Sequence, residues 1–277
     1  MLGKALHTKS IWKSNLMTDI RLASEAGFGA MEVASSKIWD YLSSGSPLSD
    51  VTERLKQYDM QIISINDIAN VERTDDDAVR NTLAETEKLS AVAQQLGCDC
   101  IQLVPLLALE GRSEDEVIEL TAKNIARICD IGAKYGVRFQ LEPVGWSPIN
   151  SLRLTQKLIQ AVGRDNFGTV IDFFHLFVGG DTTPDDVRHF DPNRIYHIHF
   201  CDCRLPKEGE SFDETILRGM YAGEGEVPLA EWVQAVKDTG YEGWWSYELI
   251  SAKHWQCDVA EVAGETSRLL DKYVLNR

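Results

Sequence analysis

Four acidic or imidazole side chains stand at or near the ends of consecutive apolar runs in the second half of the chain. Glu142 closes VRFQLE, Asp172 closes GTVID, His199 lies near the end of IYHIHF, and Glu248 closes WWSYE. If these runs are neighbouring strands, three carboxylates and an imidazole share one rim, where like charges raise one another's pKa values. A divalent metal ion would relieve that repulsion. One such residue alone is more often a solvated strand end or a capping group, but four in series favour a metal site.

The composition of this ligand set narrows the choice of metal. Three carboxylates with one imidazole suit Mn2+, Mg2+, Co2+ or Zn2+. Four ligands fill a single site, so we expect one divalent ion per chain. His197 and His199 alternate along one run and therefore share a face, so the spacing alone leaves open which of them is the ligand.

Six cysteines include two C-x-C pairs, Cys98 with Cys100 and Cys201 with Cys203. Such pairs can supply soft-metal ligands, but alternate residues of a strand share a face without any metal. We expect reduced, buried structural thiols rather than a disulfide framework.

Short runs rich in β-branched residues alternate eight times with longer amphipathic stretches. The clearest amphipathic stretch extends from Ser113 to Tyr135, where Ser113 and Glu116 form a capping box and Gly136 stands at a C-cap position. The predicted strands are Ala5 to Thr8, Ala30 to Ala34, Gln61 to Ile65, Cys100 to Val104, Val137 to Glu142, Gly168 to Asp172, Ile195 to Phe200 and Trp244 to Glu248.

Repeated strand and helix predict a parallel sheet, and eight repeats without a linker favour its closure. We therefore predict an α/β fold, a single (β/α)8 TIM-barrel domain over residues 1–277. An open Rossmann-like sheet is the alternative, but no strand-to-helix turn carries G-x-G-x-x-G, since Gly223 and Gly225 lie in a late loop. In a barrel the carboxyl ends of the strands build the active site, which is where the four residues would meet.

The connection after the seventh predicted strand is unusually long. More than two dozen residues rich in Gly, Glu and Pro separate Phe200 from the helix that begins near Pro228. Loops of this length are commonly functional lids, and this one would hang over the catalytic face. We predict that residues 204–227 close over a bound substrate, with Glu224 and Arg218 as contributors. Each of these residues taken singly is equally consistent with a solvated loop charge.

Charge and composition limit the partners. Lys plus Arg number 28 against 43 Asp plus Glu, and the net charge of −15 repels phosphate backbones, so nucleic acid is not an expected partner. The apolar runs are too short to span a membrane. The N-terminal MLGKALHTKSIWKSN lacks the apolar stretch of a signal peptide, so we expect a cytoplasmic protein without a membrane partner. A homo-oligomer is compatible with the sequence, which does not fix the number of subunits.

Segments along nearly the whole chain carry a family resemblance. The most diagnostic are D-x-x-H from Asp172 to His175, H-x-x-D from His199 to Asp202, and the late G-E-G-E turn. The chain resembles the 2-keto-myo-inositol isomerase group of the xylose-isomerase-like sugar phosphate isomerase/epimerase superfamily. The other matching segments are SNL at residues 14–16, AGFGAMEV, YGVRFQLEPVG, DNFGTVIDFFH, IYHIHFCD, GEGEVPL and GYEGWWSYEL.

The resemblance assigns roles to particular residues. It prefers His199 to His197 as the metal-binding histidine, because the H-x-x-D pattern begins at His199. It implies that the metal ligands are Glu142, Asp172, His199 and Glu248.

The resemblance also implies substrate contacts. His175 would contact the substrate, and Arg204 resembles the arginine after the strand-seven histidine of ketose epimerases, although it stands one residue nearer to that histidine. Those epimerases carry a further glutamate shortly after the strand-five ligand, where this chain has Trp146 and Pro148.

The implied reaction is proton transfer beside a carbonyl group. A metal that binds a ketone oxygen and a neighbouring hydroxyl polarises the carbonyl, and removal of the proton between them gives an enediolate. Glu142 and Glu248 are the candidate bases, one on either side of the substrate. We therefore expect a metal-dependent isomerase or epimerase whose partner is a small polyol or ketose, such as a keto-inositol.

Three other functions fit parts of this pattern. A dehydratase of an inosose or of dehydroshikimate would begin with the same proton removal, although the dehydroshikimate enzymes carry a histidine where Pro143 and Val144 follow Glu142. A metal-dependent endonuclease of the superfamily shares D-x-x-H but needs several further ligands, whereas strands two and three end in serine, asparagine and aspartate. The intact set of four ligands argues against a non-enzymatic sugar-binding barrel.

Overall fold

Eight parallel strands form the centre of the computed structural model, which describes residues 2–276. Each strand pairs with its neighbours in sequence, and β1 also pairs with β8, so the sheet closes into a barrel. The predicted (β/α)8 barrel is confirmed. The strands are β1 (Gly3–His7), β2 (Ala30–Ala34), β3 (Gln61–Ala69), β4 (Cys100–Val104), β5 (Arg138–Leu141), β6 (Phe167–Asp172), β7 (Ile195–Phe200) and β8 (Trp244–Tyr247).

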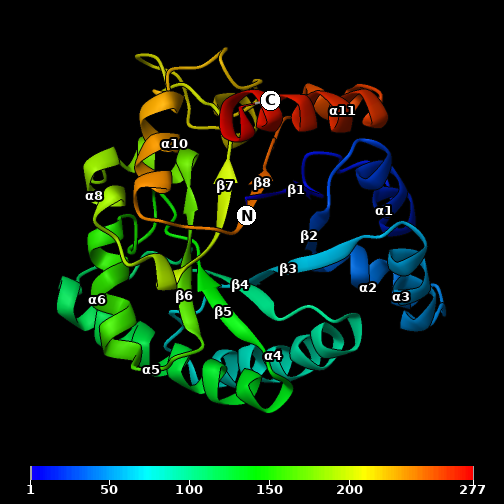
Figure 1. The fold of residues 1–277 in the computed structure, drawn as a ribbon. Helices are drawn as coiled ribbons and strands as arrows, with labels where there is room; N and C mark the ends of the chain where they lie inside the picture. Colours follow the sequence, from blue (N-terminus) through cyan, green and yellow to red (C-terminus); the bar gives the residue numbers. More distant parts are fainter. Residues whose placement is uncertain (1, 277) are drawn as a thin grey trace.

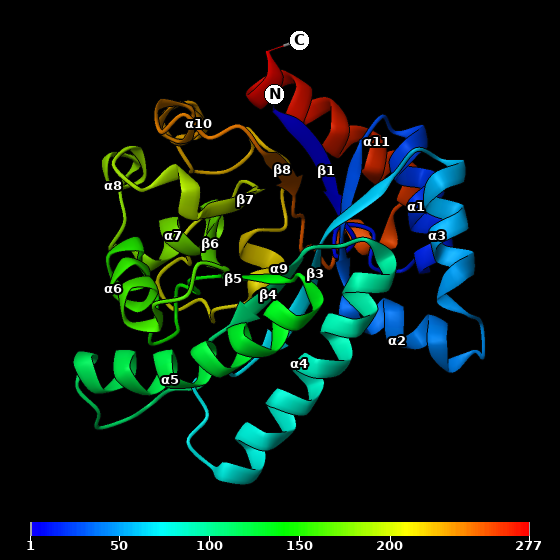
Figure 2. The same ribbon diagram turned by 60° about the horizontal axis from the view of Figure 1, so that its bottom comes forward.

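The helices form an outer ring around this barrel (Figure 1). The two ends of the chain meet, since the last helix, α11, packs against β1 and α1 near the start of the chain (Figure 2). The helices are α1 (Leu16–Glu25), α2 (Ser35–Ser43), α3 (Leu48–Gln57), α4 (Asp76–Leu96), α5 (Glu114–Gly132), α6 (Leu152–Val162), α7 (Phe173–Gly179), α8 (Pro184–Arg188), α9 (Glu214–Leu217), α10 (Leu229–Asp238) and α11 (Val259–Leu270).

The predicted strands agree closely with the observed ones, and β2, β4 and β7 match at both ends. Strands β5 and β8 end one residue before Glu142 and Glu248. Both residues nevertheless continue the ladder, because their amides donate to carbonyls of the preceding strand at 2.9 and 3.1 Å. Strand β3 extends to Ala69, further than predicted, so Asn66 and Asp67 lie within it rather than beyond its end.

The clearest predicted helix begins and ends as its sequence indicates. Ser113 and Glu116 form the reciprocal capping box at the start of α5. The chain continues after α5 through a 3-10 turn, Ala133–Tyr135, and stops at Gly136, whose φ of 71° lies in the left-handed region that favours glycine.

The barrel interior changes character along its axis. Near the amino-terminal ends of the strands it holds a small apolar cluster of Ala5, Ala30 and Ile63, against which Trp244 packs. Nearer the carboxyl ends the buried side chains are polar, and several contacts join strands that are not neighbours and so cross the interior. We call these seven residues the interior network: His7, Glu32, Ser64, Asn66, Gln102, Gln140 and His197.

The long connection after β7 is folded against the barrel. The Asp202 carboxylate accepts hydrogen bonds from the amides of Gly223, Gly225 and Val227, at 2.7, 3.0 and 3.2 Å. A Cβ atom at Gly225 would lie 2.3 Å from Asp202 Oδ1, so only glycine permits this approach. The H-x-x-D and G-E-G-E motifs therefore meet, and together they fasten the base of the loop.

Two further findings bear on the sequence predictions. No helix among residues 2–276 is both long enough and apolar enough to cross a membrane. Both C-x-C pairs are buried, as predicted, whereas Cys257 is exposed.

Candidate metal centre

The four predicted ligands meet at the carboxyl-terminal rim of the barrel. They come from β5 to β8, which are neighbours in the sheet, and Asp172 and His199 are register partners on β6 and β7. All four side chains are buried, and one ligand atom from each lies within 4.8 Å of the others. This cluster of Glu142, Asp172, His199 and Glu248 is therefore able to bind a metal ion.

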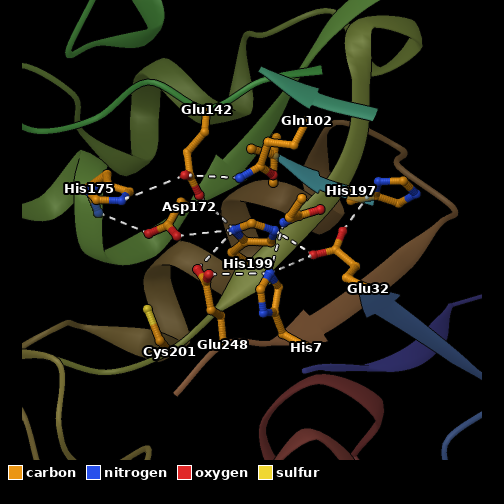
Figure 3. A network of polar contacts seen from close by, with 12 residues as sticks. His7, Glu32, Gln102, Glu142, Asp172, His175, His197, His199, Cys201 and Glu248 are labelled. Atoms are coloured by element: carbon orange, nitrogen blue, oxygen red, sulfur yellow. Dashed lines mark hydrogen bonds and ion pairs between the residues drawn. The ribbon is translucent and has the colours of Figure 1, made fainter. Parts of the chain in front are cut away.

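One nitrogen lies at the centre of the cluster (Figure 3). His199 Nδ1 is 2.9 Å from Glu142 Oε1, 3.2 Å from Asp172 Oδ2 and 3.1 Å from Glu248 Oε2. An imidazole nitrogen carries at most one proton, so it cannot donate fully to three carboxylates. A divalent cation satisfies all three oxygens and the nitrogen lone pair together, and the donor set therefore fits such an ion.

The opposite nitrogen of His199 is held by Glu32 from β2. Nε2 lies 2.7 Å from Glu32 Oε2, across the barrel interior. A carboxylate in this position accepts a hydrogen bond from Nε2–H, so that Nδ1 of the neutral imidazole can present its lone pair to a metal ion in the cluster, as the outer support of a metal-binding histidine usually does. Glu32 was not among the residues predicted from the sequence, although it is the lone charged residue of the apolar run AMEVA, which forms β2.

The structure distinguishes the two histidines of β7. His197 Nδ1 lies 2.8 Å from Gln140 Oε1, in the interior network below the rim, and burial holds its pKa well below the usual value. Burial also opposes protonation of His199, but the nearby carboxylates, led by Glu32, outweigh it and raise its pKa well above the ordinary value. It is the Nδ1 of His199, and not that of His197, that faces Glu142, Asp172 and Glu248.

Arg218 supplies a fixed positive charge beside the cluster. Its fully buried guanidinium reaches Glu248 Oε2 at 2.8 Å, Asp172 Oδ2 at 3.2 Å and Glu214 Oε1 at 2.9 Å. Burial alone would raise the pKa of Asp172, but the charge of Arg218 prevails and lowers it to about 2. At Glu248, too, burial would raise the pKa and the charge of Arg218 lowers it. The charge again prevails, so the pKa of Glu248 lies well below its usual value.

Glu142 has a different environment. Its Oε2 accepts a hydrogen bond from Gln102 Nε2 at 3.0 Å and faces His175 Nε2 at 3.9 Å. The structure gives it no contact with Arg218 within the described residues, and burial raises its pKa above the ordinary value.

The D-x-x-H motif has a structural explanation. Asp172 caps α7 with one oxygen, since Oδ1 accepts the backbone amide of His175 at 2.9 Å, while Oδ2 faces His199. The cap places the His175 ring at the edge of the site, where its Nδ1 is buried without a hydrogen-bond partner among the described residues.

A cavity of about 240 Å³ opens beside the cluster, a little below the roughly 300 Å³ at which the usual range of small-ligand pockets begins. Glu142 and Glu248 lie at its floor with Arg218, and Trp146 packs edge-on against the His175 ring at its side. A larger cavity, about 470 Å³, lies between the β1–α1 loop and α2 and contains none of the four predicted ligands. The residues that line the smaller cavity are Lys9, Asp67, Val104, Leu106, Glu142, Val144, Trp146, His175, Glu214, Arg218, Glu248 and Ile250.

The sequence of the chain now places it among known proteins. Residues 20–273 match the sequence model of the family described as Xylose isomerase-like TIM barrel. The chain belongs to this family. One family relative, the inosose isomerase of Bacillus velezensis, is 26% identical over 269 residues, which are 95% of this chain and 94% of that protein.

Two more comparisons concern a longer relative and a solved structure. The 3-dehydroshikimate dehydratase of Pseudomonas putida is 21% identical over 252 residues, 90% of this chain but 38% of that longer protein. A crystal structure of the IOLI protein with a bound zinc atom superimposes with a TM-score of 0.92 at 22% identity, over 99% of this chain and 98% of that one. That likeness establishes the shared barrel fold.

Two residues predicted to contact substrate lie elsewhere. Arg204 forms a bidentate pair with Glu210, at 2.6 and 2.7 Å, and is partly exposed. Glu224 is exposed and accepts the amide of Tyr221 at 2.9 Å within its own turn. Neither lines the cavity among the described residues. Arg218, the other predicted contributor of this loop, does line it.

Proposed function

We propose that this protein is a divalent-metal-dependent isomerase or epimerase of a small polyhydroxylated ketone, of the inosose or ketose type. The observation that carries the proposal is the single imidazole nitrogen, His199 Nδ1, surrounded by three buried carboxylates, two of which, Glu142 and Glu248, line a small cavity. The similarity to an inosose isomerase over nearly the full length of both chains supports the substrate class.

The metal would be held by Glu142, Asp172, His199 and Glu248. Oxygen ligands with one imidazole suit Mn2+, Mg2+, Co2+ or Zn2+, and the zinc atom of the IOLI protein supports including Zn2+ among them. A divalent ion at this position would polarise a ketone oxygen and make the neighbouring C–H bond more acidic.

The residues of the chain supply the proton transfers. Glu142 and Glu248 approach His199 from different sides in Figure 3, so a substrate above it would meet a carboxylate on each side. One glutamate takes the carbon-bound proton, and an enediolate forms. Return of a proton to the same carbon from the other side gives the epimer. Return to the neighbouring carbon, together with transfer of the hydroxyl proton from one oxygen to the other, gives the isomer.

The surroundings of the site would orient the substrate and exclude water. Trp146 and His175 form one wall of the cavity, and α9 brings Glu214 and Arg218 to another. Because the base of the loop is fastened by Asp202, closure over substrate would involve the exposed residues 205–213.

A dehydratase is the second candidate. The relationship to a 3-dehydroshikimate dehydratase favours it, because that reaction also begins by removing a proton next to a carbonyl. The two reactions diverge afterwards, since a dehydratase needs an acid to protonate the departing hydroxide. Product analysis therefore separates them.

The proposed function is tested by NMR in D2O with the metal-loaded protein. The substrates are 2-keto-myo-inositol, a set of ketohexoses and ketopentoses, and 3-dehydroshikimate, each with Mn2+ or Zn2+. We expect deuterium to enter the substrate or product, with the product an isomer of the same formula. Loss of water from the product would favour the dehydratase. Turnover without any solvent exchange would contradict both reactions and indicate hydride transfer.

A further inference from the structure

Lys9 is the other cation of the cavity, and its backbone is fixed on both sides. It follows β1 by two residues. Its amide donates to His7 Nδ1 at 3.2 Å, and its carbonyl accepts the indole N–H of Trp255 at 2.7 Å. These two contacts fix the point from which the side chain extends toward the cavity. The side chain, 24% exposed, lines the cavity beside the cluster.

The ammonium group lies near two carboxylates but touches neither. Lys9 Nζ is 3.7 Å from Glu248 Oε1 and 3.9 Å from Asp67 Oδ2, which is close enough for attraction and too far for a hydrogen bond. No direct hydrogen bond of this Nζ occurs within residues 2–276. The three donors of the ammonium group are therefore available to a ligand in the cavity.

Two other lysines with mostly buried side chains are placed differently. Lys4 Nζ lies 2.7 Å from both Ser267 Oγ and Asp271 Oδ2. Lys37 Nζ lies 2.6 Å from Asp19 Oδ2 and 3.1 Å from the carbonyl of Ile11. Those two lysines have direct protein partners, as a structural ion pair does. Lys9 alone of the three lines the cavity beside the cluster, and it has no hydrogen bond to a protein partner within the described residues.

Neutralisation of Glu248 does not by itself account for Lys9. Arg218 already contacts Oε2 of that carboxylate at 2.8 Å. Lys9 Nζ lies farther away, 3.7 Å from Oε1. Because Lys9 Nζ lines the cavity and forms no direct hydrogen bond with either carboxylate, an oxygen atom of a ligand in the cavity can accept from the ammonium group while Glu248 lies beside it.

We propose that Lys9 is a further catalytic residue, which donates a hydrogen bond to the substrate oxygen that becomes negative during proton transfer. The inference rests on the proposed function. When a glutamate takes the carbon-bound proton, the C–H electron pair forms the carbon–carbon double bond of the enediolate and the carbonyl oxygen gains the negative charge. The ammonium group stabilises that charge and keeps its own protons, and the charge disappears when a proton returns to carbon.

The test compares Lys9→Met and Lys9→Arg with Lys13→Met as the matched control. Lys13 lies in the same loop and is exposed, so its replacement removes the same charge without touching the cavity. The measurements are kcat, KM and the deuterium exchange rate for 2-keto-myo-inositol, together with metal content and melting temperature. Lys9→Gln is assayed in parallel, because it keeps a polar group in the cavity and guards against a folding defect of the methionine variant.

We expect Lys9→Met to lower kcat and the exchange rate by about 10²- to 10³-fold, as the loss of one oxyanion donor does, with smaller changes in KM. Metal content should stay at the wild-type level. Lys9→Arg should recover part of the rate, because it retains a charged donor with a different geometry. Lys13→Met should behave as the wild type.

Two results would overturn the inference while leaving the proposed function intact. One is a wild-type kcat in both Lys9→Met and Lys9→Gln. The other is a rise in KM alone, which would make Lys9 a binding contact without a role in the proton transfer. If the wild-type protein neither converts nor exchanges any ketone of the panel, the proposed function fails and the inference about Lys9 fails with it.

Discussion

The two halves of the barrel rim contribute to the candidate site in different ways. The half formed by β5 to β8 presents the four predicted metal ligands at its strand ends. The half formed by β1 to β4 presents Lys9 and Asp67 at the cavity and holds Glu32 deeper inside. Under the proposed function, one half binds the metal, and the other half orients the ligands.

Hydrogen bonds between the two halves support this division of roles. Glu32 of β2 holds Nε2 of His199, and Gln102 of β4 donates to Glu142. Gln102 in turn accepts from Gln140 at 3.2 Å, so the interior network extends to Glu142 through Gln102. The half without ligands is therefore expected to control metal affinity and base position, although none of its residues would touch the metal.

The largest expected effects belong to the ligand half. We predict that Glu142→Gln and Glu248→Gln each lower turnover and deuterium exchange by about 10²- to 10⁴-fold at saturating metal, because an amide retains an oxygen ligand but is not a base. NMR in D2O with the metal-replete variants measures this. Wild-type exchange rates in both variants would remove these glutamates from the proton transfer.

Replacing His199 should weaken metal binding much more than replacing His197. Loss of a direct ligand in His199→Asn should weaken metal binding more than the roughly 10- to 100-fold that loss of an outer partner causes. His197→Asn should retain one ion per chain, because His197 contacts Gln140 below the rim. Metal analysis after dialysis and titration calorimetry would decide. Equal losses in both variants would contradict the assignment of His199.

Glu32→Gln tests the orienting half directly. An amide keeps the size of the side chain but loses the charge that holds the Nε2 proton of His199, so we expect metal affinity to fall by about 10- to 100-fold. Glu119→Gln, an exposed change on α5, serves as the control for charge removal. An unchanged dissociation constant for Glu32→Gln would mean that the β1 to β4 half does not orient the ligands.

The smallest effects are expected outside the cavity. Arg204→Met and Glu224→Gln should leave kcat/KM within about two-fold of the wild type, in the range of surface changes away from special contacts. The structure engages Arg204 with Glu210 and Glu224 with its own turn. A loss of kcat/KM beyond ten-fold would show that the loop rearranges on substrate binding and brings these side chains to the site.

The fold, and the meeting of the four candidate ligands at one rim, could be predicted from the sequence for a local reason. Buried parallel strands read as continuous apolar runs, and a polar residue that ends such a run marks the rim of a barrel. Glu142, Asp172 and Glu248 each end one of those runs. Nothing in the prediction required knowledge of which residues approach one another across the barrel.

The remaining parts of the site depend on contacts that sequence spacing does not encode. His197 and His199 are equivalent in a two-residue period, and only their depth in the barrel distinguishes them. Lys9 was overlooked because it lies in a loop two residues after a short strand. Arg204 and Arg218 are both arginines of one long loop, and the tertiary fold of that loop decided which of them became buried at the cluster.

The polar interior network limits how this protein could be engineered for heat resistance. Replacing buried polar groups by well-packed apolar ones is often neutral or stabilising, and natural proteins leave such gains unused. Here Glu32 and Gln102 would look like favourable targets to any procedure that scores stability alone. A thermostable variant with leucine and isoleucine in place of the interior network would be expected to fold well and to bind the metal ion less tightly. Residues near the rim should therefore be kept unchanged while the helices are redesigned.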